Sequence, residues 1–192
     1  MSFTDLLTNS GAFKTDFYSL WLGDSLAIFD TAGSLKIVND SQRMGYGLPL
    51  ANNREFKPGQ RAQDAIFNSD QRLVALSSDV RHGFRHSHKA MYEVATVELG
   101  QFGNHQSIGP TGNGGEALQL FKWNPAPGAR DFVFVYENNI YYQSDYMFGQ
   151  PLPVTTTGNE HKYHGIADWL YEEEIFSDST ALWWSSSGDY LA

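Results

Sequence analysis

An aromatic residue, a cluster of turn-forming residues and an apolar run follow one another in Trp123-Asn124-Pro125-Ala126-Pro127-Gly128 and then Phe132-Val133-Phe134-Val135-Tyr136. The same order recurs upstream in Phe67–Ala75 and downstream in Trp184–Ala192. A strand–turn–strand unit that returns at a spacing of roughly 40–60 residues is typical of the blades of a β-propeller. The repeat therefore predicts an all-β fold, and by itself it leaves a generic β-sandwich open.

Composition and local patterning also favour strands over helices. The chain has 192 residues, of which 41% are hydrophobic and 15% aromatic, with 18 glycines, a mixture that suits short strands joined by tight turns. We expect a turn at Asn138-Asn139, between the predicted strands Phe132–Tyr136 and Ile140–Gln143, because asparagine tolerates positive φ. The predicted strands are Phe17–Leu22, Ser25–Asp30, Leu35–Asn39, Phe132–Tyr136 and Ile140–Gln143.

Segments of low apolar content separate the repeats. We interpret Gly100–Glu116 as a flexible loop or insertion, and Asn52–Gln63 as a linker between blades. The last repeat stops at Tyr190-Leu191-Ala192, where a strand is expected to begin, and a half-built blade would leave unpaired strand edges. We therefore expect residues 1–192 to be a single propeller portion that is truncated at its C-terminus.

Charge and cysteine content exclude several kinds of partner and site. The net charge is −9, so phosphate-rich nucleic acid is not an expected partner. The chain has no cysteine and hence no disulfide, thiolate metal site or cysteine nucleophile of its own. The start, Met1–Leu7, has no basic region followed by an apolar stretch, so it does not predict a signal peptide.

Motifs for a catalytic centre are missing from the sequence. It contains no Gly-x-Ser-x-Gly elbow, no phosphate-binding Gly-x-x-x-x-Gly-Lys loop and no His-Glu-x-x-His zinc helix. His86 and His88 would share one face of a strand and could hold a metal, but a polar strand edge is favoured because no third ligand is near. We expect no metal and no cofactor.

The segment Asp168-Trp169-Leu170-Tyr171-Glu172-Glu173-Glu174 is the strongest candidate for a binding site. Asp168 can cap a short helix whose first turns carry the three glutamates, and carboxylates there complement the helix dipole. That structural role is one interpretation. The other is that crowded carboxylates beside apolar residues bind a cation, such as the α-ammonium of a peptide. Arg85 is a second candidate, since its guanidinium could bind a backbone carbonyl of the same peptide or hold the carboxylates in place. The alternative is an ordinary surface arginine.

These residues carry a family resemblance. His164–Phe176, followed by Ala181–Ser185, resembles the Asn-Gly-Ile-x-Asp-Trp-Val-Tyr-Glu-Glu-Glu and Ala-Leu-Trp-Trp-Ser pattern of the dipeptidyl peptidase IV family. Phe84–Ser87 looks like the family's Trp-Arg-His-Ser motif, and Phe3–Leu7 is similar to the opening of its propeller. Phe84, His164 and Ser186 depart from the family's Trp, Asn and Pro.

The resemblance implies an eight-bladed propeller followed by an α/β-hydrolase domain, in a serine exopeptidase that removes N-terminal Xaa-Pro or Xaa-Ala dipeptides. This chain would supply about three to four blades with a short inserted acidic helix. Glu173 and Glu174 would bind the substrate's ammonium group, Arg85 its carbonyl, with Glu172 and Asp168 in support. The catalytic triad would lie outside the chain, which we expect to be inactive alone.

The resemblance further implies peptide substrates with a free N-terminus and a homodimeric full-length protein. It places that protein on the extracellular side of the plasma membrane, held by an anchor outside this chain, or makes it secreted. Asn39-Asp40-Ser41 is a glycosylation sequon that agrees with such a location. Relatives that have lost the serine and act as ion-channel auxiliary subunits or binding scaffolds keep similar acidic segments, and they are the alternative.

Overall fold

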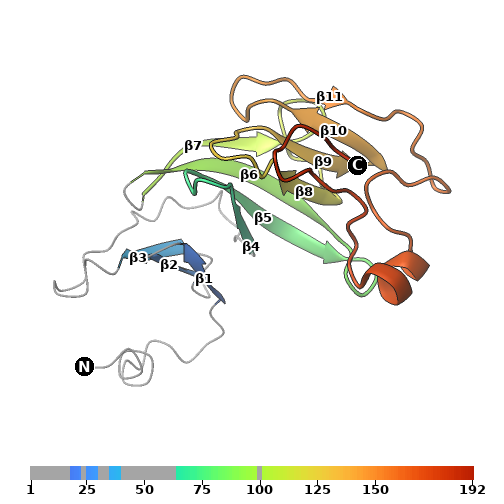
Figure 1. The fold of residues 1–192 in the computed structure, drawn as a ribbon, viewed down its shortest axis with the longest axis horizontal. Coiled ribbons are helices and arrows are strands. Elements are labelled where there is room, and N and C mark those ends of the chain that lie inside the picture. The colour runs from blue at the N-terminus through green and yellow to red at the C-terminus, as the bar shows by residue number, and fades with distance from the viewer. Residues whose placement is uncertain (1–17, 23–24, 30–34, 40–63, 99–100) are drawn as a thin grey trace. The chain divides into compact units, whose positions relative to one another are not determined.

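The computed structural model describes residues 18–22, 25–29, 35–39, 64–98 and 101–192 (Figure 1). The chain divides into two compact units, residues 1–61 with 99–101, and residues 62–98 with 102–192. The first unit contains a three-stranded antiparallel sheet, β1-β2-β3. Its strands are β1 (Tyr18–Leu22), β2 (Ser25–Phe29) and β3 (Leu35–Asn39), which confirms the predicted strand and hairpin. The predicted linker Asn52–Gln63 lies outside the described residues.

The first sheet of the second unit has the order β4-β5-β6-β7. Its strands are β4 (Asp64–Phe67), β5 (Leu73–His82), β6 (His88–Glu98) and β7 (Gln101–Ile108). The interpretation of Gly100–Glu116 as a loop was therefore wrong for residues 101–108. Strand β7 is last in the sheet order, and such a strand can be polar and can include Gly103, whose carbonyl accepts a hydrogen bond from Thr96 Oγ1 at 2.8 Å.

The second sheet of this unit has the order β11-β10-β9-β8. Its strands are β8 (Leu120–Trp123), β9 (Phe132–Tyr136), β10 (Asn139–Gln143) and β11 (Leu152–Pro153). The β9–β10 hairpin is confirmed, but its turn lies one residue earlier than predicted. Asn139 pairs with Tyr136, and the turn residues are Glu137 and Asn138, with φ of 46° and 59°. Two positive φ values give the turn the twist that a two-residue hairpin needs.

Aromatic side chains form the core that joins the two sheets of the second unit. Tyr92 of β6 stacks on Phe121 of β8, with ring centroids 5.4 Å apart. Phe121 also meets Trp123 and Phe132 at 5.0 Å and 4.9 Å. Backbone hydrogen bonds between Ala90 and Leu118 connect the sheets as well. Burial of this cluster is the main stabilising contribution that the two sheets share.

The repeated sequence unit corresponds to a repeated turn that links one strand unit to the next. Asn68 follows β4, and its Nδ2 donates to the Ala129 carbonyl at 3.1 Å in the next copy of the turn. Asn124 occupies the matching place after β8, and its Nδ2 donates to the Gly188 carbonyl at 3.0 Å in the third copy. Both asparagines are buried, so these bonds are made where an unpaired amide would be costly.

Within the second unit, the acidic segment extends from a short two-stranded stem. The stem pairs Ile166 with Thr180, and Ala167 N–H donates to the Ser179 carbonyl at 2.9 Å. Between its two arms lies the helix η2 (Tyr171–Phe176), the red coil beside the end of β5 in Figure 1. The expected short helix is a π-helix, a form with i→i+5 hydrogen bonds that is rare and often found at functional sites.

Candidate functional site

Asp168 starts the acidic helix as the sequence predicts. Its Oδ1 accepts hydrogen bonds from the backbone N–H groups of Leu170 and Tyr171, at 3.0 Å and 2.9 Å. Its carbonyl accepts one from Glu172 N–H at 2.8 Å. A side-chain oxygen that satisfies free N–H groups at a helix start is the action of an N-cap. Asp168 therefore shapes the segment that carries the glutamates.

The three consecutive glutamates have three different environments. Glu172 is fully buried, the side chain of Glu173 is 24% exposed, and Glu174 is exposed. Successive side chains point in different directions around a helix, so one glutamate can face the protein while its neighbours face solvent. The sequence presents these residues as equivalent, and their separation into one buried and two accessible carboxylates comes from tertiary structure.

Arg85 and Glu173 come together across the predicted site. Arg85 lies in the loop between β5 and β6, and its Nη2 is 3.3 Å from Glu173 Oε2. The Arg85 side chain is 65% exposed, so the pair is open to solvent and contributes little to stability. Its consequence is electrostatic, because an arginine beside the Glu173 carboxylate makes a surface with both a cationic and an anionic part. Such a surface can contact a polar backbone at more than one point.

The Arg85 loop is closed by Ser87, a residue that sequence reasoning missed. The Ser87 carbonyl accepts from Gly83 N–H at 2.8 Å, and its Oγ accepts from Phe84 N–H at 2.9 Å. A serine whose hydroxyl satisfies a backbone N–H in a tight loop is common in turns. In the sequence, the signal that could have indicated this closed loop was the spacing of Gly83 and Ser87 on either side of Arg85.

Exposed apolar side chains flank the accessible carboxylates. Phe176 lies 5.7 Å from the Tyr171 ring and 5.6 Å from the Trp183 ring, measured between centroids, and all three residues are exposed. Trp169, at 57% exposure, lies at the start of the same segment. Carboxylates next to apolar surface are less well solvated than carboxylates in open water, which strengthens their attraction for a cation.

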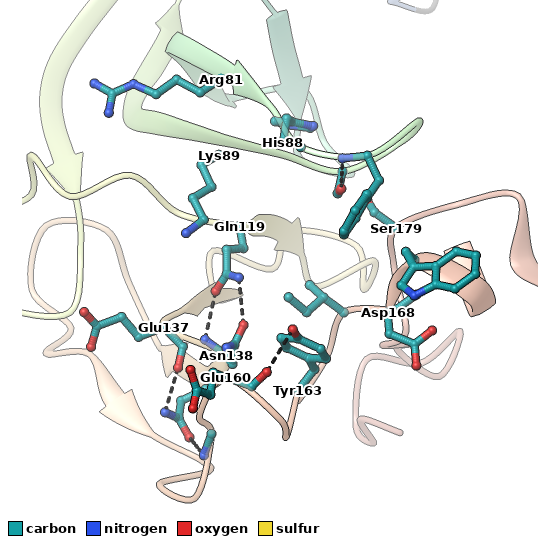
Figure 2. A pocket seen from close by; sticks show the side chains of 18 of the residues that line it. Arg81, His88, Lys89, Gln119, Glu137, Asn138, Glu160, Tyr163, Asp168 and Ser179 are labelled. Atoms are coloured by element: carbon teal, nitrogen blue, oxygen red, sulfur yellow. Dashed lines mark hydrogen bonds between the residues drawn. The ribbon is translucent and has the colours of Figure 1, made fainter. Parts of the chain in front are cut away.

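A cavity of about 750 Å³ lies next to the candidate site, and Figure 2 shows its lining. Phe84 and Trp169 line it, whereas Arg85, Glu173 and Glu174 do not. Its lining includes residues of both charge signs, among them Lys89 and Glu137. It also includes paired amides, since Gln119 Nε2 donates to Asn138 Oδ1 at 2.8 Å (Figure 2). We assign the candidate site to the charged pair outside the cavity, because an ammonium group is recognised by carboxylates rather than by enclosed volume.

The histidines differ from the predicted arrangement. His86 lies in the loop rather than on a strand, and strand β6 begins at His88, so the two do not share a strand face. His88 instead pairs with His82 across β5 and β6, with ring centroids 6.5 Å apart. Among the residues that the structure describes, no group of three or more metal-ligating side chains is close enough to hold an ion.

Asn39, the predicted glycosylation residue, is the last residue of β3, while Asp40 and Ser41 of its sequon lie outside the described residues. Within the described ranges, no helix has the length and apolar character needed to cross a membrane.

Known proteins are similar to this chain in sequence and in fold. The family description "Dipeptidyl peptidase IV (DPP IV) N-terminal region" matches residues 68–192. Dipeptidyl peptidase family member 2 of Caenorhabditis elegans is 31% identical over 94% of the chain, and Inactive dipeptidyl peptidase 10 of Mus musculus is 29% identical over 90%. The chain spans 21% of the length of each of these two relatives.

A solved structure agrees with the sequence comparisons. The crystal structure of Porphyromonas gingivalis dipeptidyl peptidase 4 superposes with a TM-score of 0.65 and 20% identity, over 98% of this chain and 26% of that one. Together with the antiparallel sheets and repeated turns, this likeness makes the fold part of a β-propeller, as predicted. The chain belongs to the dipeptidyl peptidase IV family, and the matched residues are those of the family's N-terminal region.

Proposed function

We propose that this chain is the substrate-recognition part of a dipeptidyl peptidase, in which Glu173 and Glu174 bind the free amino terminus of a peptide. The observation that carries the proposal is the 3.3 Å contact between Arg85 and Glu173, which brings a cation and a carboxylate from two distant segments to one accessible place. Glutamates whose only role was to stabilise the start of a helix would not need Arg85 as a partner.

Glu173 and Glu174 supply the negative charge of the proposed site, and Arg85 supplies its positive charge. Glu173 is already partnered by Arg85, whereas Glu174 is exposed, and the two follow each other on η2. An α-ammonium group has three donors and can bond both carboxylates at once. The Arg85 guanidinium has further donors beyond the one directed at Glu173, and these can bind the first carbonyl of the same peptide. In this arrangement, binding of the amino terminus would fix the position of each following residue of the peptide.

The whole protein would be a serine exopeptidase that removes Xaa-Pro or Xaa-Ala dipeptides, with its catalytic triad in a hydrolase domain outside residues 1–192. We further propose that it acts as a homodimer, on the extracellular side of the plasma membrane or in secreted form. Asp168 would support the site by capping the helix that presents Glu173 and Glu174.

A second candidate function is a binding scaffold without catalysis. The observation that favours it is the 29% identity to Inactive dipeptidyl peptidase 10 of Mus musculus, close to the 31% identity to the C. elegans relative. The acidic segment does not separate the two functions, since both need only recognition. A Gly-x-Ser-x-Gly sequence in the coding region downstream of residue 192 would favour the peptidase, and its absence would favour the scaffold.

Binding of a short peptide tests the proposed recognition. Calorimetric titration of the chain with Gly-Pro amide is expected to give measurable affinity, and N-acetyl-Gly-Pro amide is expected to bind at least about tenfold more weakly, because it lacks the charged donors. Glu173→Gln and Glu174→Gln should each cause a loss of similar size. Asp189→Asn, which removes an exposed carboxylate outside both the site and the cavity, is the control and should bind like wild type. Equal affinity for the free and acetylated peptides would refute the proposal.

A further inference from the structure

Glu172 is a buried carboxylate that the proposed contacts with a peptide do not use. It is fully buried although it stands next to the two accessible glutamates of η2. Burying a carboxylate costs free energy unless hydrogen bonds compensate for the lost water. A leucine or methionine would fill the same space without that cost, so the presence of a charge here calls for a physical reason.

Two backbone donors account for one oxygen of this carboxylate. Glu172 Oε1 accepts hydrogen bonds from the N–H groups of His86 and Ser87, at 2.5 Å and 2.8 Å. Both donors belong to the loop that carries Arg85, and Ser87 is also the residue that closes this loop on Gly83 and Phe84. Glu172 thus binds the loop as a unit, through charge-assisted bonds, which are about twice as strong as neutral ones.

The second oxygen gives an independent observation. Glu172 Oε2 is buried, and it has no hydrogen-bond partner among the described residues. A residue chosen only for stability would not leave a buried acceptor unpaired, because such an atom loses water without replacement. We therefore attribute the presence of this carboxylate to the two hydrogen bonds that Oε1 accepts.

We propose that Glu172 is a positioning residue that fixes the Arg85 loop against η2 and so sets the Arg85–Glu173 pair. Arg85 directly precedes His86, so the two bonds from His86 and Ser87 hold the backbone from which the guanidinium extends. The Arg85 side chain is 65% exposed, and packing alone holds it only weakly. The effect of Glu172 on peptide binding rests on the proposed function, whereas its anchoring of the Arg85 loop does not.

Amide hydrogen exchange in the complete chain tests the anchor without any peptide. In Glu172→Ala the His86 and Ser87 amides are expected to exchange about tenfold faster or more, which corresponds to the loss of one strong hydrogen bond. Glu172→Gln keeps an acceptor oxygen and should retain most of the protection. The Phe134 amide in β9 serves as the reference for global unfolding. Unchanged exchange at both loop amides in Glu172→Ala would overturn the proposal.

Non-additive effects on peptide binding test the positioning role. Glu172→Ala should weaken Gly-Pro amide binding about tenfold in the wild-type background and have no effect in an Arg85→Ala background, because both changes remove one interaction. Equal losses in the two backgrounds would show a merely structural role and refute positioning. If wild-type chain does not bind the peptide, the proposed function fails, and the exchange experiment still decides whether Glu172 anchors the loop.

Discussion

Gly165 is the residue whose conformation and surroundings most clearly require glycine near the acidic segment. Its φ is +76°, and a Cβ there would lie 3.0 Å from both Ile140 Cγ1 and Val135 Cγ2. Residues other than glycine rarely adopt such a φ, and the two neighbours are packed beside the stem, with Val135 fully buried and Ile140 half-buried. We expect Gly165→Ala to lower the free energy of unfolding by about 2–4 kcal/mol, from backbone strain and crowding together.

Gly128 provides the matched control for this prediction. Its φ is +73°, close to that of Gly165, but nothing lies within 4 Å of the Cβ that alanine would add. Gly128→Ala should therefore cost only the strain, about 1 kcal/mol. Urea unfolding of the two variants measures the difference, which is the contribution of packing. Equal losses of stability in both variants would contradict the packing argument.

The sequence predicts the chemistry of individual site residues better than their surroundings. Arg85, Glu173 and Asp168 were selected from the family motif together with charge and capping, which are local properties that a sequence displays, and their roles in binding stay predictions. Glu172 could be identified only as a supporting residue, because its burial depends on the docking of the stem against a loop that is 86 residues away in the chain. The shared strand face expected for His86 and His88 was wrong, because strand β5 ends at His82 and β6 begins at His88, which leaves His86 in the loop between them.

Short strands made mostly of apolar residues were predicted, whereas the longer mixed strand β6 and the polar strand β7 were missed. Strands β2, β3 and β9 are short and apolar, so their residue types alone indicate strands. Strand β7 is polar, and it forms because β6 offers it a backbone edge, a condition that composition does not record. The turn at Glu137 was misplaced because cross-strand register, rather than the preference of Asn139 for positive φ, decides which residues turn.

Strand β6 makes the stability of its sheet sensitive to alkaline pH through Tyr92. Burial raises the pKa of the Tyr92 phenol from 10.0 to about 12, and the nearby charge of Asp64 adds to the rise. The folded state therefore binds the phenolic proton more tightly than the unfolded state does. Its contribution to stability is complete below pH 10 and is lost as the pH rises from 10 towards 12. Acidic conditions leave this contribution unchanged.

Tyr92→Phe is expected to remove this alkaline loss. The free energy of unfolding in urea, measured from pH 8 to pH 11, should fall less in the variant than in wild type above pH 10, by about 1.4 kcal/mol for each pH unit at most. Tyr190→Phe is the control, because Tyr190 is 76% exposed and contributes no buried phenol. An identical decline in wild type and Tyr92→Phe would show that burial of Tyr92 does not govern the alkaline limit.

The second unit as a whole combines two kinds of connection between its sheets. The aromatic cluster around Phe121 supplies non-directional burial, while the bonds from Asn68 and Asn124 fix the repeated turns relative to one another. The two asparagine hydrogen bonds occur at equivalent places, so each repeated turn is joined to the next by the same interaction. A repeated unit that buries its face only against its neighbour is what the propeller architecture requires. The stem that carries η2 and the loop that carries Arg85 are fixed to this repeating scaffold.

Separation of recognition from catalysis is the prediction that concerns the entire chain. Cleaving a peptide bond through a covalent intermediate needs a nucleophile next to a base, and the candidate site offers carboxylates and a guanidinium with neither a cysteine nor a Gly-x-Ser-x-Gly serine in the chain. Purified residues 1–192 should therefore bind Gly-Pro amide yet leave Gly-Pro p-nitroanilide uncleaved in an absorbance assay. Release of p-nitroaniline above the rate in buffer, and abolished by Glu173→Gln, would mean that the chain carries its own nucleophile and that its role is not recognition alone.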